Sequence, residues 1–547
     1  MASQLLNSLL LLSSLFLSST NAHNSSLSSA SSPTPPLNST KSLESHLYSL
    51  KSVCRTTPYP DHCFDTLKLS LSINISPNIL NVLLQSLKAA FSQGLKLSDL
   101  FSNAGRENLI EKQRGTLQDC TELHQITLSA LQKSISRINS RNKLSDARAF
   151  LSAALTNKVT CLEGLDSAHG PLKPALVDSL TSTYAHISNS LSLLPRPGSP
   201  AGGGGGRRRL LGYPRWVSRK ARRVLQSSGE EYDPSEVVTV AADGTGNFTT
   251  IGDAINLAPN NSVDRIFIYI REGVYEENVE IPSWKPNIVL LGDGRDVTVI
   301  SGSKSVGDGW TTFRSATLAV SGEGFLARDL TFENTAGPGK HQAVALRINA
   351  DLAAVYRCTI TGYQDTLYIH SFRQFYRECD IYGTIDYIFG NAAVIFQGCN
   401  IVSRMPMPGQ ATVITAQSRD TPDEDTGISM QNCSVLATDD LYSNSNTVKS
   451  FLGRPWKNYS RTVLLESYID DFIAPVGWSK WVGDQGLDTL YYGEYENYGP
   501  GSSTDGRVSW AGYHVMDYYD ASNFTVSEFI SGQDWLDSTS FPYDDGV

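Results

Sequence analysis

With 547 residues, the chain is longer than one typical domain, and this length predicts at least two domains that each bury a core. The net charge of -10 is unevenly divided: residues 1–225 carry 25 Lys and Arg against 12 Asp and Glu, whereas residues 226–547 carry 20 against 43. Most of these charges are expected to lie on solvated surfaces. The acidic excess of the second part argues against a nucleic-acid-binding function.

An apolar stretch lies near the N-terminus, from Leu5 to Leu17, and small residues follow it at Thr20 and Ala22. This pattern predicts a secretory signal peptide over residues 1–22, although the segment before it holds no Lys or Arg. No comparable apolar run follows, so the sequence predicts no membrane span. We therefore expect a secreted protein.

The eight cysteines form two groups of four, one in each half of the chain. In an oxidising compartment, an even number per half favours disulfides within each half, without deciding the partners. The cysteines are Cys54, Cys63, Cys120 and Cys161, then Cys358, Cys379, Cys399 and Cys433. Glycosylation triplets fit the same compartment and begin, among others, at Asn74, Asn247, Asn458 and Asn523.

Residues 41–195 carry the three- and four-residue spacing of amphipathic helices. Helices with short connections pack as a bundle, so we predict an all-α four-helix-bundle domain here. Because His124 and the scattered acids form no recognisable site, we interpret this domain as a scaffold without a catalytic role. The clearest apolar stripe is Val177, Leu180, Tyr184, Ile187, Leu191 and Leu194.

A flexible linker is predicted at residues 196–225, because a run of glycines disfavours secondary structure. Two basic clusters follow the glycines, and a dibasic site in a flexible secreted segment is open to proteolysis. The alternative is a linker that serves only solubility. The candidate processing residues are Arg208, Arg209, Leu210 and Leu211, then Arg222, Arg223, Val224 and Leu225.

Residues 237–547 consist of short β-rich runs punctuated by Gly and Asn. The four cysteines in this part recur at spacings of 21, 20 and 34, each with an apolar or aromatic residue three positions before it and Ile or Val two positions after it. A period of about twenty β-patterned residues without a helix in each repeat is typical of a parallel β-solenoid. We predict an all-β right-handed parallel β-helix whose coils stack about 4.8 Å apart.

Two aspartates, Asp365 and Asp386, each lie seven residues after one of these cysteines. Stacked coils would bring their carboxylates to roughly 5 Å from each other, and like charges so close need a functional reason. The alternative is a chance alignment of two carboxylates that face water. Such a pair can hold one group protonated and the other ionised, but this alone names no reaction, because it also suits a retaining glycosidase.

The neighbouring residues favour acyl transfer. Gln364 directly precedes Asp365, and Gln342 lies about one coil earlier. Neutral amide donors suit a developing oxyanion better than an oxocarbenium-like centre, although either glutamine could instead only bridge coils. Arg454 could keep a nucleophilic carboxylate ionised, and Trp456 could stack on a sugar ring or simply pack. The motifs of serine hydrolases, zinc proteases and P-loop proteins do not occur.

Five sequence fragments occur together in one order, namely GVYEE (Gly273 to Glu277), HQAVALR (His341 to Arg347), GYQDTLY (Gly362 to Tyr368), GTIDYIFGNA (Gly383 to Ala392) and LGRPW (Leu452 to Trp456). Together they resemble plant pectin methylesterases, and the resemblance runs from about residue 237 to the C-terminus. The helical part is similar to pectin methylesterase inhibitors and resembles the pro-region of these enzymes.

The resemblance implies a role for each candidate residue. Asp386 would attack the C6 methyl ester of a galacturonate unit, while Asp365 would protonate the departing methanol and then activate water. Gln342 and Gln364 would form the oxyanion hole, and Arg454 would orient Asp386. No metal or organic cofactor is implied.

Further details follow from the same resemblance. Thr312 and Trp456 match substrate-contacting positions of the family. Tyr387 stands where many relatives have Phe, which leaves details of the pocket open. The resemblance also implies the disulfides Cys54–Cys63 and Cys120–Cys161, and it suggests Cys358–Cys379 and Cys399–Cys433 while leaving partner choice in that half open.

Processing and location are implied as well. Both basic clusters resemble the family's processing motifs, and we expect release after Leu225 to give a monomeric enzyme that starts near Gln226. It would act on methyl-esterified homogalacturonan in the cell wall, and its expected partners are a processing protease and an inhibitor protein related to its own pro-region. The helical part would keep the enzyme inactive until cleavage, and the opposite net charges of the two parts suggest an attraction that salt screens.

Three other functions remain as alternatives at this point. The first is a β-helix glycosidase of the polygalacturonase type, and the second is a pectate lyase, which would need an acidic cluster for Ca²⁺. The third is a catalytically inactive wall-binding or inhibitory protein that acts through its helical part.

Overall fold

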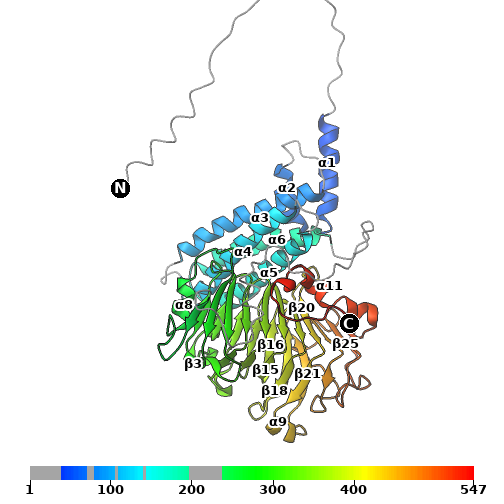
Figure 1. The fold of residues 1–547 in the computed structure, drawn as a ribbon. Helices are drawn as coiled ribbons and strands as arrows, with labels where there is room; N and C mark the ends of the chain where they lie inside the picture. The colour runs from blue at the N-terminus through cyan, green and yellow to red at the C-terminus, as the bar shows by residue number, and fades with distance from the viewer. Residues whose placement is uncertain (1–38, 71–78, 105–108, 139–142, 196–236) are drawn as a thin grey trace, which may run out of the picture. The chain divides into compact units, whose positions relative to one another are not determined.

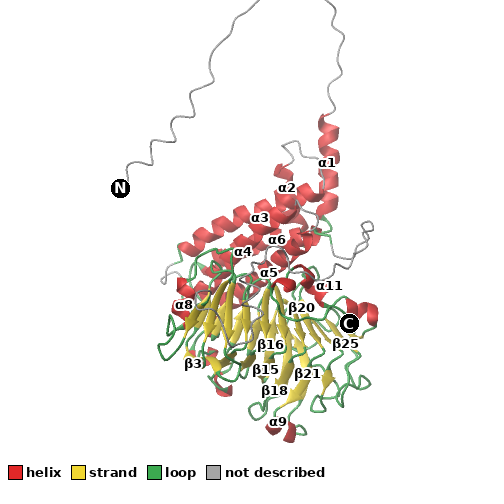
Figure 2. Cartoon of the chain, in the orientation of Figure 1, coloured by secondary structure: helices red, strands yellow, loops and turns green. Residues whose placement is uncertain are grey.

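The computed structural model describes residues 39–70, 79–104, 109–138, 143–195 and 237–547 (Figures 1 and 2). The predicted signal peptide and the predicted processing linker lie outside these residues. Leu47–Val547 form one unit that contains both helices and sheets. Within the described ranges, no helix combines the length and the apolar character needed to cross a membrane.

Six helices make up the described part of the N-terminal region, two more than the predicted four-helix bundle contains. Helix α3 contacts α4 and α6, and α5 contacts the same two helices, which is the closed arrangement of a four-helix bundle. Most of the predicted stripe on α6, from Leu180 to Leu194, is buried in the core of this bundle. The helices are α1 (Ser39–Cys54), α2 (Pro60–Ser70), α3 (Ile79–Ser102), α4 (Thr116–Ile138), α5 (Leu144–Asp166) and α6 (Lys173–Leu193).

Two disulfides hold this region together. Cys54–Cys63 joins the end of α1 to α2, and Cys120–Cys161 joins α4 to α5. Both pairings are those that the family resemblance implies. The second bond links α4 and α5, the two helices that contact the β-helix described below.

The C-terminal part is a parallel β-helix, as predicted, and its strands form three sheets. Its coils follow one another from β3 (green) to β25 (orange) in Figure 1. The eleven-stranded sheet contains, in spatial order, β1 (Val238–Val240), β2 (Ile266–Ile270), β5 (Ile288–Gly292), β8 (Leu326–Arg328), β11 (Ala353–Tyr356), β14 (Arg373–Arg377), β17 (Ala393–Gln397), β20 (Gly427–Gln431), β23 (Arg461–Leu465), β25 (Tyr491–Tyr495) and β26 (Tyr513–Val515).

The eight-stranded sheet contains β24 (Tyr468–Ile469), β21 (Ser434–Ala437), β18 (Asn400–Ser403), β15 (Asp380–Gly383), β12 (Thr359–Thr361), β9 (Thr331–Asn334), β6 (Thr298–Gly302) and β3 (Gly273–Glu276). The seven-stranded sheet, which carries the candidate site, contains β22 (Ser450–Pro455), β19 (Thr412–Gln417), β16 (Ile385–Gly390), β13 (Leu367–Ile369), β10 (Leu346–Ile348), β7 (Leu318–Val320) and β4 (Val279–Ile281).

Short helices cover parts of the β-helix. Thr250 caps α8 (Ile251–Leu257) by accepting a hydrogen bond from the backbone N–H of Asp253, and the apolar side of α8 joins the core of the first coils. Near the C-terminus, α11 (Val526–Ile530) packs on the outer face of the eleven-stranded sheet. The other α-helices of residues 237–547 are α9 (Asp439–Ser443) and α10 (Tyr518–Ser522).

The register of the coils confirms the repeat read from the cysteines. The residues three positions before the cysteines pair with one another across β11, β14, β17 and β20 in the order Val355, Tyr376, Phe396 and Met430. The residues two positions after them pair in the order Ile360, Ile381, Ile401 and Val435. All eight side chains are buried in the interior of the β-helix.

The four cysteines of the β-helix are free thiols, so the two disulfides suggested for this half are wrong. Neighbouring coils lie about 4.8 Å apart and their equivalent side chains point the same way. A disulfide instead needs Cβ atoms about 3.8 Å apart and a twist of about 90° between them. The stacked thiols therefore act as small buried groups; the Sγ of Cys379, for example, lies 3.5 Å from the carbonyl oxygen of Val355.

Candidate active site

The two aspartates and their predicted partners line one cavity of about 350 Å³. The β-helix collects them because successive coils place equivalent residues beside one another on the seven-stranded sheet. All seven side chains to which the sequence assigns chemistry or substrate contact lie in its wall, namely Thr312, Gln342, Gln364, Asp365, Asp386, Arg454 and Trp456.

Asp386 lies at an irregularity in β16. Its strand pairs with β19 at Ile385 and again at Ile388, where the register shifts by one residue. The backbone of Asp386 has a φ of 50°, a left-handed conformation that costs a non-glycine residue on the order of 1 kcal/mol. Bulges of this kind re-aim side chains beside active sites. Here Asp386 faces the cavity while the next two residues, Tyr387 and Ile388, remain in the core.

Asp365 lies opposite Asp386 on the preceding coil. Leu367 pairs with Ile388, and this offset of 21 residues also relates the two aspartates, as the cysteine spacing predicts. The backbone N–H of Asp365 donates to the carbonyl of Ile385 at 3.0 Å. Burial raises the pKa of Asp365 well above its usual range, and the charge of Asp386 raises it further. Asp365 is thus held in its protonated form.

Arg454 gives Asp386 a different environment. Its Nε donates to Oδ1 of Asp386 at 2.8 Å and its second guanidinium nitrogen donates to Oδ2 at 2.6 Å, which is a bidentate pair. Burial raises the pKa of Asp386, but the hydrogen bonds and the charge of Arg454 oppose this rise. The pair therefore divides the roles: Asp386 is the group stabilised as a carboxylate, and Asp365 is the group that keeps a proton.

The two glutamines lie in the cavity wall with their side-chain amides uncommitted. Within the described part of the chain, neither Gln342 nor Gln364 uses its side chain in a hydrogen bond, whereas their backbone carbonyls accept from the N–H groups of Val306 and Ala343. Both side chains are partly exposed. These side chains therefore do not bridge the coils, which was the alternative. Two free amide donors beside a paired carboxylate can stabilise an oxyanion.

Aromatic rings form much of the remaining wall. Trp456 stacks on Trp481 with ring centroids 6.3 Å apart, and Arg454 lies over the Trp481 ring at 4.3 Å. Tyr368 stacks on Phe389 at 4.2 Å. Of these rings, only Trp456 is predictable from the sequence as a substrate contact, because the others look like ordinary apolar residues of strands and loops. Only the pairing of Tyr368 with Phe389 on neighbouring strands could have been inferred from the 21-residue register.

The hydroxyl of Tyr387 does not reach this cavity. Its ring belongs to the interior of the β-helix, where the hydroxyl lies 3.1 Å from that of Ser403. The exchange of Phe for Tyr at this position therefore changes the core and leaves the pocket unchanged.

The helical part also supplies a wall of the cavity, which the interpretation as a mere scaffold missed. Thr116 and Asp119 of α4, and Thr160 and Glu163 of α5, line it together with the β-helix residues. Leu123 of α4 packs in the same apolar cluster as several rings of the cavity wall. Helices α4 and α5 thus lie against the site.

Polar contacts connect the same two helices to the β-helix. Glu163 forms an ion pair at 2.7 Å with Lys457, the residue that follows Trp456 in the chain. The hydroxyl of Thr160 lies 2.9 Å from Nε2 of His370, whose Nδ1 lies 2.9 Å from Oγ of Ser371. Burial lowers the pKa of His370 well below its usual range, so this histidine is neutral and structural.

Comparisons with known proteins agree with this geometry. The pectinesterase family model matches residues 237–533, and the plant invertase/pectin methylesterase inhibitor family model matches residues 48–193. Probable pectinesterase/pectinesterase inhibitor 12 of Arabidopsis thaliana is 68% identical over 519 residues, which cover 92% of this chain and 95% of that protein. Pectinesterase 2 of Citrus sinensis is 44% identical over 504 residues, which cover 91% and 95%.

A solved structure supports the fold of the C-terminal part. Pectin methylesterase from carrot is 51% identical, with a TM-score of 0.57, over 58% of this chain and 100% of its own. A relative of about the size of the β-helix thus folds as a separate chain. The protein belongs to the pectinesterase family of carboxylic ester hydrolases and carries an N-terminal domain of the pectin methylesterase inhibitor family.

Proposed function

We propose that this protein is a secreted pectin methylesterase that removes C6 methyl esters from galacturonate units of methyl-esterified homogalacturonan. The observation that carries the chemistry is the buried pair of Asp386, held by Arg454, and Asp365, whose pKa is raised beside it. A glycosidase has no need for two uncommitted amide donors at the same place.

The reaction uses only these side chains. A carboxylate oxygen of Asp386 attacks the ester carbonyl, and Gln342 and Gln364 donate hydrogen bonds to the oxyanion that forms. Asp365 gives its proton to the leaving methoxide, which departs as methanol and leaves an anhydride on Asp386. Asp365 then takes a proton from water, whose oxygen attacks the anhydride and releases the galacturonic acid. Thr312 and Trp456 would position the sugar units.

The carboxylate assignment is tested with Asp386→Asn in the separated β-helix. An amide oxygen is a far weaker nucleophile, so methanol release from methylated pectin should fall by several orders of magnitude. Asp329→Asn is a matched control, because Asp329 also has a left-handed φ, of 60°, and also pairs with an arginine, Arg357, but at a distance from the cavity. Full activity of Asp386→Asn would remove it as nucleophile, and new reducing ends would indicate a glycosidase.

We also propose that the helical domain keeps the enzyme inactive until the linker is cut by a processing protease. Support comes from α4 and α5, which wall the cavity and place Leu123, with 1% of its surface exposed, among its aromatic and apolar side chains. The uncut chain should therefore be nearly inactive, and Leu123→Asp should activate it, because a charge buried in an apolar contact is costly. Leu95→Asp, at a position that is 50% exposed, is the control. Equal activity of the uncut chain and of the β-helix separated from the helical domain would contradict inhibition.

Secretion to the cell wall rests on the predicted signal peptide and on two disulfides, which persist in oxidising compartments. Glycosylation triplets within the described residues begin, among others, at Asn247, Asn458 and Asn523, and all three asparagines lie on the surface. Protein from plant cells should lose mass on treatment with an endoglycosidase. An unchanged mass, together with an intact N-terminal leader, would argue against passage through the secretory pathway.

A further inference from the structure

Arg148 of α5 is a buried arginine at the contact between the helical domain and the β-helix. It is 1% exposed, and its guanidinium donates to both carboxylate oxygens of Asp425, to Oδ1 at 3.0 Å. It also donates to the backbone carbonyl of Asp423 at 2.6 Å. Neither Arg148 nor any residue of 418–426 is among the described residues that line the catalytic cavity. This contact is therefore separate from the candidate active site.

The β-helix side of the contact is a loop of fixed shape, residues 418–426, which we call the acidic loop. Glu424 is 1% exposed and holds the loop from inside, because one of its oxygens accepts from two backbone N–H groups of the loop at 2.9 Å. Its other oxygen accepts from the side chain of Asn391 at 3.1 Å, and Arg419 donates to its carbonyl at 2.8 Å. These bonds join residues of the β-helix only, so the loop presents Asp425 as part of a preformed guanidinium site.

The helical domain orients Arg148 without neutralising its charge. The remaining guanidinium nitrogen donates to the carbonyls of Leu194 at 3.0 Å and Leu191 at 3.4 Å, at the C-terminal end of α6. These carbonyls carry only partial charges, and among the described residues Asp425 is the only acid in an ion pair with Arg148. Loss of Asp425 would leave a buried, unpaired charge, which is strongly unfavourable. Arg148 thus joins the end of α6 to the β-helix.

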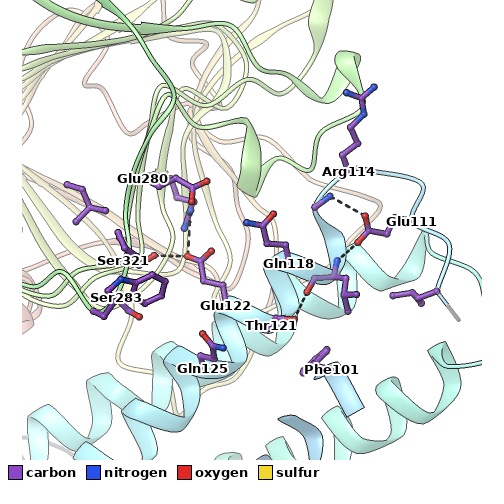
Figure 3. Close-up of a pocket in the computed structure, with 18 of the residues that line it drawn as sticks. Phe101, Glu111, Arg114, Gln118, Thr121, Glu122, Gln125, Glu280, Ser283 and Ser321 are labelled. Carbon is purple, nitrogen blue, oxygen red and sulfur yellow. Dashed lines mark hydrogen bonds and ion pairs between the residues drawn. The ribbon is translucent and has the colours of Figure 1, made fainter. Parts of the chain in front are cut away.

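Arg114 is another arginine of the helical domain that reaches the β-helix, and it makes a weaker contact. Figure 3 shows it extending from the segment before α4 alongside the β-helix. Its side chain is exposed and lies 5.7 Å from the centre of the Trp310 ring. An exposed cation–π contact of this kind changes a dissociation constant by roughly two- to fivefold. Hydrogen bonds from a buried arginine to a carboxylate change it by roughly ten- to a hundredfold, so Arg148 should contribute more.

We propose that the acidic loop is an arginine-binding site of the β-helix, and that Arg148 in this site keeps the helical domain bound after the linker has been cut. The site contains no residue of the predicted linker, so proteolysis leaves every one of these contacts in place. Release of the β-helix then needs dissociation of Arg148 as well as proteolysis. The helical domain of a second molecule would fit the same site, whereas an inhibitor of the same fold without this arginine would bind more weakly.

The experiment uses the full chain, folded intact, with a specific protease site inserted in the glycine run of residues 202–206. After cutting, gel filtration over a dilution series gives the Kd of the two halves. Arg148→Gln and Asp425→Asn should each raise this Kd by roughly ten- to a hundredfold. Arg114→Gln is the control and should raise it by no more than about fivefold.

Asp425→Asn keeps the test independent of the fold of the helical domain, where Arg148 also contacts α6. The side chain of Asp425 is 37% exposed and lies outside the catalytic cavity, so this variant should leave methanol release by the separated β-helix unchanged. Combining it with Arg148→Gln should raise the Kd little further, because both changes remove one contact. Residues that act independently would instead give effects that multiply to within about twofold.

The outcomes separate retention of the helical domain from inhibition. If both single variants keep the Kd of the unmodified halves, or if their effects multiply in the double variant, the arginine-binding site is wrong. If the unmodified halves separate as soon as the linker is cut, retention is wrong. If the halves stay together but release methanol as fast as the separated β-helix, the site stands and the proposed inhibition fails.

Discussion

Replacing Arg454 with glutamine isolates what the guanidinium contributes to the nucleophile. The bidentate pair joins Arg454, 27% exposed, to Asp386, 7% exposed, at 2.8 and 2.6 Å. Hydrogen bonds to charged groups contribute about 1.5–3 kcal/mol, which corresponds to roughly ten- to a hundredfold in rate. Because Arg454 opposes the rise that burial causes in the pKa of Asp386, its loss should raise this pKa further.

The sign of the pH dependence follows from that shift. Asp386 must be ionised to attack, so the acid limb of kcat/KM for methanol release should move to higher pH in Arg454→Gln, with the largest loss on the acidic side. Initial rates between pH 4 and 9, measured with the separated β-helix, would show this.

Arg357→Gln is a matched control for this measurement. Arg357 binds Asp329 at the same two distances, 2.8 and 2.6 Å, but is 45% exposed, and exposed pairs contribute about 0–1 kcal/mol. Its pH profile should stay that of the unmodified enzyme. A loss of activity in Arg454→Gln that is equal at all pH values would refute the electrostatic role and leave Arg454 as a substrate contact.

Three further predictions concern the contact between the domains and the core of the β-helix. Burial raises the pKa of Asp119 to about 7 despite Arg314, so association of the cut halves takes up a proton. Association should therefore weaken as pH rises from 5 to 7, with Kd rising by up to tenfold per pH unit. Asp119→Asn should flatten this dependence, and a Kd that falls with rising pH would contradict it. The four thiols of the β-helix should react with a thiol reagent only after unfolding. Cys379→Ser should lower the free energy of unfolding by about 1–3 kcal/mol, because it leaves a hydroxyl in the core. Disulfides among these four cysteines, found by peptide mass mapping, would contradict the free thiols. Tyr387→Phe should leave kcat/KM unchanged and alter only the melting temperature, since its hydroxyl contacts Ser403 inside the β-helix; a change in KM would place it in the pocket after all.

The repeat in the sequence was sufficient to predict much of the fold. The cysteine spacing predicted which residues stack between coils, because a parallel β-helix repeats one register from coil to coil and neighbours in space are then about one period apart in the chain. The same rule placed Asp365 beside Asp386 and Gln342 one coil away. The apolar stripes of the helices depend on local geometry too, and the structure confirms them.

Other features could be seen only in the folded protein. The cysteine pattern suggested disulfides in the β-helix, but the strand spacing keeps those sulfurs apart as thiols. The shifted register and left-handed backbone at Asp386 depend on how β16 fits β19, which its own residues do not reveal. The docking of α4 depends even less on local sequence, because Glu122 meets Ser321 and Arg314 across almost 200 residues. Periodicity determines neighbours within a repeat, whereas contacts between two different surfaces depend on shapes and charges that exist only after each has folded.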